Sequence, residues 1–184
     1  MGCIGTSAER GGVIEYRQFG KIKKEASALG FGCMRLPRTD AGTIDEPEAT
    51  RVLYHAIEHG VNYFDTAYGY HNGESERFLG KALEPGGRRS KVWVATKLPC
   101  WAVKEAADFD LRFNEQLEKL RTDYVDVYLL HGLGRKRWDM VRGLGVLDWL
   151  DKLRASGRAR AVGFSFHDTY DVFKEIVDAY PHWD

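Results

Sequence analysis

The hydrophobic positions of this chain alternate between strand and helix patterns. Short apolar runs, typical of buried strands, occupy residues 61–64, 92–96, 124–130 and 161–165. Apolar stripes with helical spacing occupy residues 47–59, 74–83, 109–120, 146–153 and 172–180. Strand and helix therefore alternate at about thirty residues per unit, the size of a βα module in a parallel sheet.

Two further strand patterns precede this repeat. Residues 13–19 alternate as a half-exposed strand does, and Gly20 offers a turn, so a β-hairpin is predicted. Residues 28–34 form a compact apolar run that is typical of a buried strand. Residues 1–12 are small and polar. We therefore expect a flexible N-terminal tail at 1–12 and one domain at 13–184.

The βα repeat fits two folds, a doubly wound sheet and a barrel. The dinucleotide fingerprint of doubly wound sheets is missing, because Arg35 and Arg137 stand where the third glycine would follow Gly30-Phe-Gly32 and Gly132-Leu-Gly134. The predicted fold is therefore α/β, of the (β/α)8 TIM-barrel type, with an N-terminal β-hairpin. About five βα units are present, whereas a closed barrel takes ~250 residues and eight strands.

An incomplete barrel has two unpaired sheet edges and an uncovered apolar interior. We therefore expect this chain to be a fragment or truncated form, in which Trp183-Asp184 precedes a missing sixth strand. Self-association through the open edges is a further expectation.

Composition narrows the classes of partner. Lys+Arg and Asp+Glu balance at 27 each, so no bulk charge draws the protein to nucleic acid or to a charged membrane. No apolar run approaches membrane-spanning length. The cysteines Cys3, Cys33 and Cys100 are widely spaced, which argues against disulfides and zinc and favours a reducing, cytoplasmic setting. We expect no metal site and no nucleic-acid or membrane partner.

Three short patterns have plain interpretations. Met1 to Thr6 fits the loose N-myristoylation pattern, but a disordered leader or an upstream start codon is favoured. His55 and His59 are one helical turn apart, and a solvated face is favoured over a metal pair. The basic run Arg135-Lys-Arg137 is interpreted as a solvated loop.

Polar residues stand at the ends of the predicted strands, where barrel enzymes carry their working groups. Reading only those ends gives Met34, Asp65, Lys97, His131 and Ser165. Gly69 is predicted to form a tight turn that presents Tyr70 after Asp65. Singly, these residues could be a helix cap, a solvated lysine, a packing histidine and a surface tyrosine. An acid, a base, an imidazole and a phenol at one rim together favour chemistry.

The chemistry that this set suits is acid-catalysed carbonyl reduction. Reduction requires a proton for the developing alkoxide, and a free phenol is too weak an acid to be ideal at neutral pH. A nearby ammonium such as Lys97 favours the phenolate and makes Tyr70 a better donor. Asp65 would hold Lys97 in place and keep it charged. His131 would orient the carbonyl oxygen or share the proton transfer.

In the motifs that contain these residues, the sequence resembles the aldo-keto reductases. The matching segments, which follow the family's motif order, are Asp65-Thr-Ala-Tyr-Gly-Tyr70 with Glu74, Val94-Ala-Thr-Lys97, Asp123 to His131, and Gly163-Phe-Ser165. The resemblance implies a catalytic tetrad of Asp65, Tyr70, Lys97 and His131, with Tyr70 as general acid. It also implies a small-molecule carbonyl substrate. A nicotinamide cofactor, NADPH or alternatively NADH, would be bound by Met34, Asp65 and Ser165.

Two departures from the family qualify what the resemblance implies. They are the residues after Ser165 and the early end of the chain, before the late loops that would hold the cofactor's adenosine phosphate. The family commonly has Ser-Asn after the fifth strand, whereas Ser165 is followed by Phe166 and His167. The segment Leu29 to Pro37 looks like a bacterial or archaeal branch whose longer members often add an iron–sulfur domain, and no such cysteine cluster exists here. An alternative function is a truncated, non-catalytic module that binds the cofactor weakly or mediates an interaction.

Overall fold

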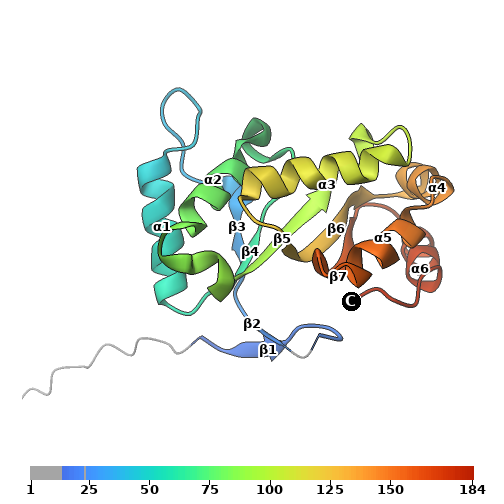
Figure 1. The fold of residues 1–184 in the computed structure, drawn as a ribbon, viewed down its shortest axis with the longest axis horizontal. Coiled ribbons are helices and arrows are strands. Elements are labelled where there is room, and N and C mark those ends of the chain that lie inside the picture. The colour runs from blue at the N-terminus through green and yellow to red at the C-terminus, as the bar shows by residue number, and fades with distance from the viewer. Residues whose placement is uncertain (1–13, 23) are drawn as a thin grey trace, which may run out of the picture.

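A parallel sheet of five strands forms the centre of the molecule, in a computed structural model that describes residues 14–22 and 24–184. The strands follow one another in chain order (Figure 1). They are β3 (Phe31–Gly32), β4 (Tyr63–Asp65), β5 (Trp93–Leu98), β6 (Val125–Leu133) and β7 (Ala159–Phe166). Because every neighbour in the sheet is also the next strand in sequence, the sheet is an incomplete (β/α) barrel, as predicted. A doubly wound sheet would reverse its strand order.

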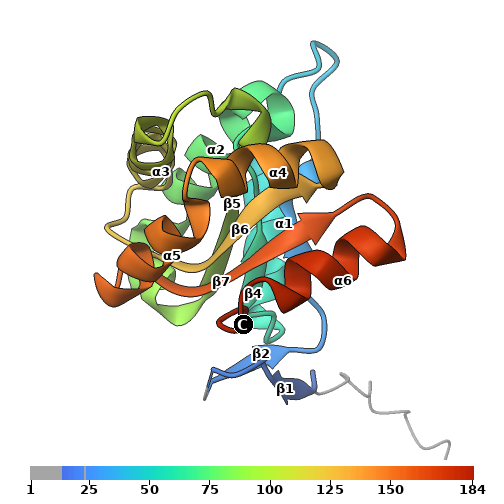
Figure 2. The same ribbon diagram turned by 90° about the vertical axis from the view of Figure 1, so that its right-hand side faces the viewer.

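Helices cover the outer face of the sheet. They are α1 (Glu46–Glu58), α2 (Glu74–Leu83), α3 (Ala107–Leu120), α4 (Arg135–Gly143), α5 (Val146–Ala155) and α6 (Tyr170–Asp178). Phe64, Val94 and Tyr128 point outward from their strands and join helix residues in the main hydrophobic core. Figure 2 shows α4, α5 and α6 arranged around β6 and β7. None of the helices within the described ranges is long and apolar enough to cross a bilayer.

A short antiparallel hairpin closes the lower end of the inner face. It consists of β1 (Tyr16–Gln18) and β2 (Glu25–Ser27), and it lies below the sheet in Figure 1. Phe19 stacks on Tyr63 with 5.4 Å between ring centroids, and its ring lies 5.4 Å from that of Trp93. Trp93 belongs to a second, smaller core of inward-facing residues. The hairpin therefore covers the end of the barrel opposite to the predicted site.

Local signals explain why the helices begin and end where they do. Asp45 caps α1 by accepting a hydrogen bond from the Glu48 N–H, and Pro47 stands in the first turn. Gly60 follows the helix with a φ of +93°, a conformation that favours glycine. The helix predicted at 47–59 is thereby confirmed, and α2 has the predicted bounds.

Two predicted strands are longer than the structure allows. The run 28–34 forms only the two-residue β3, in which Leu29 takes no part and is 63% exposed, and Met34 lies in a 3₁₀ turn. As an edge strand, β3 pairs on one side only, with β4. The run 13–19 forms β1 over three residues. Val13, the predicted tail and the motif Met1 to Thr6 lie outside the described residues.

The interpretation of Arg135-Lys-Arg137 as a loop is wrong, because these residues form the first turn of α4. Trp138 and Val141 bury one face of this helix. The side chain of Asp168 accepts a hydrogen bond from the Arg135 N–H at 2.7 Å and so satisfies one of the free donors at the helix start. Because only two residues of α4 are buried, its sequence gives too little apolar periodicity to predict a helix.

Candidate active site

The amine of Lys97 forms the centre of a polar cluster at the carboxyl ends of the strands. Its Nζ donates to Oδ1 of Asp65 at 2.6 Å, to the carbonyl oxygen of Thr66 at 2.7 Å and to the Tyr70 hydroxyl at 3.2 Å. Lys97 is only 4% exposed. β4 and β5 pair with Asp65 opposite Ala95, so Lys97 stands two residues further along the same face. These three contacts can use all three donor hydrogens of the ammonium group.

Tyr70 stands between two turns, of which the sequence predicted the first. The tight turn predicted at Gly69 is present, because the Tyr70 N–H donates to the Ala67 carbonyl oxygen at 3.1 Å, and Gly69 lies in this turn with right-handed angles, φ −94° and ψ −3°. The left-handed residues come after the tyrosine and are His71, Asn72 and Gly73. His71 anchors the turn, since its Nε2 accepts a hydrogen bond from the Leu36 N–H at 3.2 Å. The turn holds Tyr70 against the segment that follows β3.

His131 faces Tyr70 from β6. The two rings meet edge to face, with centroids 6.0 Å apart and an angle of 84° between their planes. The ring of Trp101 also packs against His131, with 5.0 Å between the ring centroids. Burial lowers the pKa of His131 to about 4, and the nearby cations Lys97 and Arg137 contribute to this shift. His131 is therefore a neutral imidazole at neutral pH.

Ser165 and Met34 lie on either side of this cluster. Ser165 is beside His131, because its Oγ accepts a hydrogen bond from the N–H of Gly132 at 2.7 Å. Met34 lies at the other end of the sheet, after β3, and is 51% exposed. The structure thus brings Asp65, Tyr70, Lys97 and His131 together, and it places Met34 in the 3₁₀ turn after β3 and Ser165 on β7.

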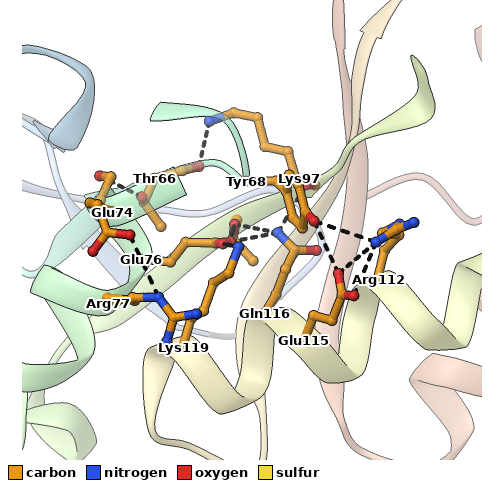
Figure 3. Close-up of polar contacts among 12 residues, drawn as sticks. Thr66, Tyr68, Glu74, Glu76, Arg77, Lys97, Arg112, Glu115, Gln116 and Lys119 are labelled. Carbon is orange, nitrogen blue, oxygen red and sulfur yellow. Dashed lines mark hydrogen bonds and ion pairs between the residues drawn. The ribbon is translucent and has the colours of Figure 1, made fainter. Parts of the chain in front are cut away.

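A buried polar network contacts the backbone of Lys97 on the side of helices α2 and α3 (Figure 3). Nε2 of Gln116 lies 3.0 Å from the Lys97 carbonyl oxygen and 2.5 Å from Oε1 of Glu76. Thr96 donates to the same Glu76 oxygen at 2.6 Å, and the Tyr128 hydroxyl donates to Oε1 of Gln116 at 2.7 Å. Burial raises the pKa of Glu76. The network fixes the backbone at Lys97 from helices α2 and α3.

The sequence signals for these supporting residues are weak. Gln116 and Glu76 stand within helices and not at strand ends, so a search of strand ends misses them. Trp101 was identifiable in principle, as a large aromatic residue three positions after β5. Trp101 is 49% exposed, so burial in the core does not explain a large aromatic residue at this position.

Neither cysteines nor metal ligands form a second centre in the part of the chain that the structure describes. Burial raises the pKa of the Cys33 thiol to about 12 and that of Cys100 to about 11, so neither is a thiolate at neutral pH. Among residues 14–22 and 24–184, no three His, Cys, Asp or Glu side chains are grouped so that they could hold a metal ion. The exposed rings of His55 and His59 lie 4.0 Å apart.

Comparison with known proteins identifies the family. The model of the aldo/keto reductase family matches residues 28–182. The chain belongs to the aldo/keto reductase family. This confirms the family and the fold that the sequence motifs predicted.

The relatives place the chain within this family. L-galactose dehydrogenase of Arabidopsis thaliana is 33% identical over 174 residues, which are 91% of this chain and 53% of that protein. An aldo-keto reductase of Bacillus subtilis is 29% identical over 175 residues, 89% of this chain and 51% of that protein. The chain thus spans about half the length of these curated relatives.

Solved structures show the same similarity in three dimensions. An aldo-keto reductase from Bacillus halodurans in its holo form superposes with a TM-score of 0.76 at 32% identity. The match covers 91% of this chain and 55% of that one. The five-stranded sheet therefore corresponds to part of a family barrel.

Proposed function

We propose that this chain carries the proton-delivery site of an oxidoreductase that reduces an aldehyde or a ketone to an alcohol. NADPH is the expected cofactor, and NADH is the alternative. The observation that supports this most directly is the position of the Lys97 amine, 2.6 Å from the Asp65 carboxylate and 3.2 Å from the Tyr70 hydroxyl. Membership of the aldo/keto reductase family supports the same class of reaction.

Tyr70 is the proposed general acid. When it gives its proton to the oxygen of the reacting carbonyl, a phenolate remains, and the positive charge of Lys97 stabilises that phenolate. Lys97 Nζ lies 4.8 Å from the centroid of the Tyr70 ring as well as close to its hydroxyl. Asp65 and the Thr66 carbonyl hold the ammonium in this position. The three groups together keep a positive charge next to the oxygen that gives up the proton.

His131 is proposed to orient the carbonyl. Because its pKa is lowered to about 4, the ring is neutral and one ring nitrogen carries a hydrogen that can be donated. A neutral donor polarises the carbonyl oxygen without competing with Tyr70 as a proton source. The rings of Tyr70 and Trp101 both pack against the ring of His131 and hold it in place.

The residues present fit the carboxamide of a nicotinamide. Ser165 accepts a hydrogen bond from Gly132, so its own hydroxyl hydrogen remains for an amide oxygen. The Asp65 side chain is 31% exposed and can accept from an amide N–H. Met34 adds exposed apolar surface in the 3₁₀ turn after β3. A nicotinamide cofactor, when bound, would supply the hydride for the carbonyl carbon.

A pair of tyrosine variants tests this function. We expect Tyr70→Phe to lower kcat for an aromatic aldehyde at least about a hundredfold, because the proton donor is removed. Tyr68→Phe is the matched control, since it removes a nearby phenol that bonds Glu115 and lies outside the cluster. NADPH oxidation measures the rate, and circular dichroism confirms folding. Full activity of Tyr70→Phe, or a wild-type chain that reduces no aldehyde, would contradict the proposal.

A further inference from the structure

A cavity of about 280 Å³ opens beside His131 at the carboxyl ends of β6 and β7. Its lining comes from the end of β6, the first turn of α4 and the two residues after β7, and consists of Gly132, Gly134, Arg135, Lys136, Arg137, His167 and Asp168. Three of these residues are the consecutive cations Arg135, Lys136 and Arg137. The cavity lies next to the proposed reaction centre, because Gly132 follows His131 directly.

Arg137 is held close to the reaction centre by two contacts. Its guanidinium donates to the carbonyl oxygen of Gly132 at 2.7 Å. It also lies 6.0 Å from the ring centroid of Trp101, the residue that packs on His131. A guanidinium has five N–H donors, so the bond to Gly132 leaves further donors for a ligand. The contribution of Arg137 to the lowered pKa of His131 agrees with this proximity.

The charge of the cavity is only partly compensated by carboxylates. Arg135 pairs with Glu175 at 2.6 Å. Asp168 has both oxygens engaged, since they accept hydrogen bonds from the backbone N–H groups of Arg135 and Thr169. Over the described ranges of the chain, the ion pairs within 4.0 Å include neither Lys136 nor Arg137. Two positive charges therefore face the cavity without a carboxylate partner.

We propose that this cavity selects carbonyl substrates that also carry an anionic group, a carboxylate or a phosphate, bound by Arg137 with help from Lys136. The proposal rests on the proposed reductase function, and it names the substrate class for that site. The planar guanidinium binds such oxygens through two parallel hydrogen bonds, which gives orientation as well as affinity. Anchoring the anion beside His131 would direct the carbonyl of the same molecule toward Tyr70 and His131.

Matched substrates test the selectivity. The measured quantity is the ratio of kcat/KM for 4-carboxybenzaldehyde to that for methyl 4-formylbenzoate, which differ in charge at similar shape. We expect the wild type to favour the acid, and Arg137→Gln to reduce the ratio about tenfold, as for a lost charge-assisted hydrogen bond. An aldehyde bearing a phosphate monoester forms the second arm. The arm with the larger ratio identifies the preferred anion.

Two further variants separate charge recognition from a structural role of Arg137. Arg137→Lys keeps the charge and should retain most of the wild-type ratio. If Arg137 had only a structural role, the lysine variant would lose the ratio as Arg137→Gln does. Arg142→Gln removes an equal charge from the same helix, away from the cavity, and should leave the ratio unchanged. Equal ratios in wild type and Arg137→Gln would overturn the proposal.

A binding measurement keeps the proposal distinct from the reductase function. Trp101 lies close to Arg137, so quenching of its fluorescence should report benzoate binding, with benzamide as the neutral probe. Loss of the quenching in Trp101→Phe would show that Trp101 is the source of the signal. The anion site is supported if benzoate binds more tightly than benzamide and if this preference is smaller in Arg137→Gln. If the same protein reduces no aldehyde, the anion site stands and the reductase function fails. Equal binding of both probes to the wild type would overturn the anion site.

Discussion

Lys97 and Asp65 form an ion pair in which the two partners are unequally buried. The side chain of Lys97 is 5% exposed and that of Asp65 is 31% exposed, with 2.6 Å between Nζ and Oδ1. A buried ammonium is costly unless it is paired and hydrogen-bonded. Here the carboxylate supplies the charge and the Thr66 carbonyl supplies a further acceptor. The pair lets the barrel keep a positive charge beside Tyr70.

Removing the carboxylate should therefore destabilise the fold as well as the chemistry. We expect Asp65→Asn to lower the free energy of unfolding by about 2–4 kcal/mol, because Lys97 loses its charged partner. The double variant Asp65→Asn/Lys97→Met should recover part of this loss. Glu84→Gln, which breaks an exposed pair with Arg121, should cost under about 1 kcal/mol. Urea denaturation of the wild type and the three variants measures these losses; equal losses for Asp65→Asn and Glu84→Gln would contradict the argument.

The lowered pKa of His131 predicts a pH dependence of stability. The pKa is about 4 in the folded protein and ordinarily 6.5, so between these values the unfolded chain binds a proton that the folded one does not. Stability should therefore fall as the pH drops from about 6.5 to about 4. His131→Gln lacks this effect.

The difference in unfolding free energy between wild type and His131→Gln isolates this histidine, because the other titrating groups cancel. We expect the unfolding free energy of the wild type to fall steadily relative to that of His131→Gln as the pH drops from about 6.5 to about 4. Denaturation at a series of pH values measures it. A difference that stayed constant from pH 7 to pH 4 would show that His131 titrates normally.

The sequence predicted the barrel and the four central residues because both depend on local patterns. A strand such as β5 appears as an apolar run, and Lys97 stands near its end, so the rim could be assembled without coordinates. Helix α4 was missed because its stability comes from elsewhere: two buried residues and a cap supplied by Asp168 from another segment. Such a cap depends on tertiary contact and leaves no signal nearby in sequence.

The supporting residues were missed for a related reason. Gln116 lies nineteen positions from Lys97 in the chain, and only the packing of α3 on β5 brings it to the Lys97 carbonyl. The second turn, after Tyr70, was also missed. Gly69 indicated the turn before Tyr70, but the left-handed conformation of His71 and Asn72 after it has no such glycine signal. Contacts such as the one from Leu36 to His71 select that conformation, and the local sequence does not.

Truncating Gln116 should be costly although it carries no charge. Gln116→Ala leaves the Tyr128 hydroxyl and the Lys97 carbonyl without their buried partner, so we expect a loss of about 2–4 kcal/mol in unfolding free energy. Asn114→Ala is the matched control on the same helix, where the side chain is exposed and accepts a hydrogen bond from Arg158, and it should cost under about 1 kcal/mol. Thermal or urea denaturation distinguishes the two. Similar losses would mean that the network adds nothing to stability.

The close packing of α2 against α3 makes a specific demand on Gly80. A Cβ at this position would lie 2.6 Å from the Lys119 carbonyl oxygen and 2.6 Å from the Leu120 carbonyl carbon, and backbone atoms cannot move aside as a flexible side chain does. We expect Gly80→Ala to destabilise the protein by about 1–3 kcal/mol, despite the better helix propensity of alanine.

Gly143 at the end of α4 provides the control, because a Cβ there meets no atom within 4 Å. Gly143→Ala should leave stability unchanged or raise it by up to about 1 kcal/mol. Displacing α2 would also separate Glu76 from Gln116, so Gly80→Ala should lower the reductase rate while Gly143→Ala should not. Denaturation and NADPH oxidation measure both effects. Equal stability of the two variants would show that α2 and α3 can separate without cost.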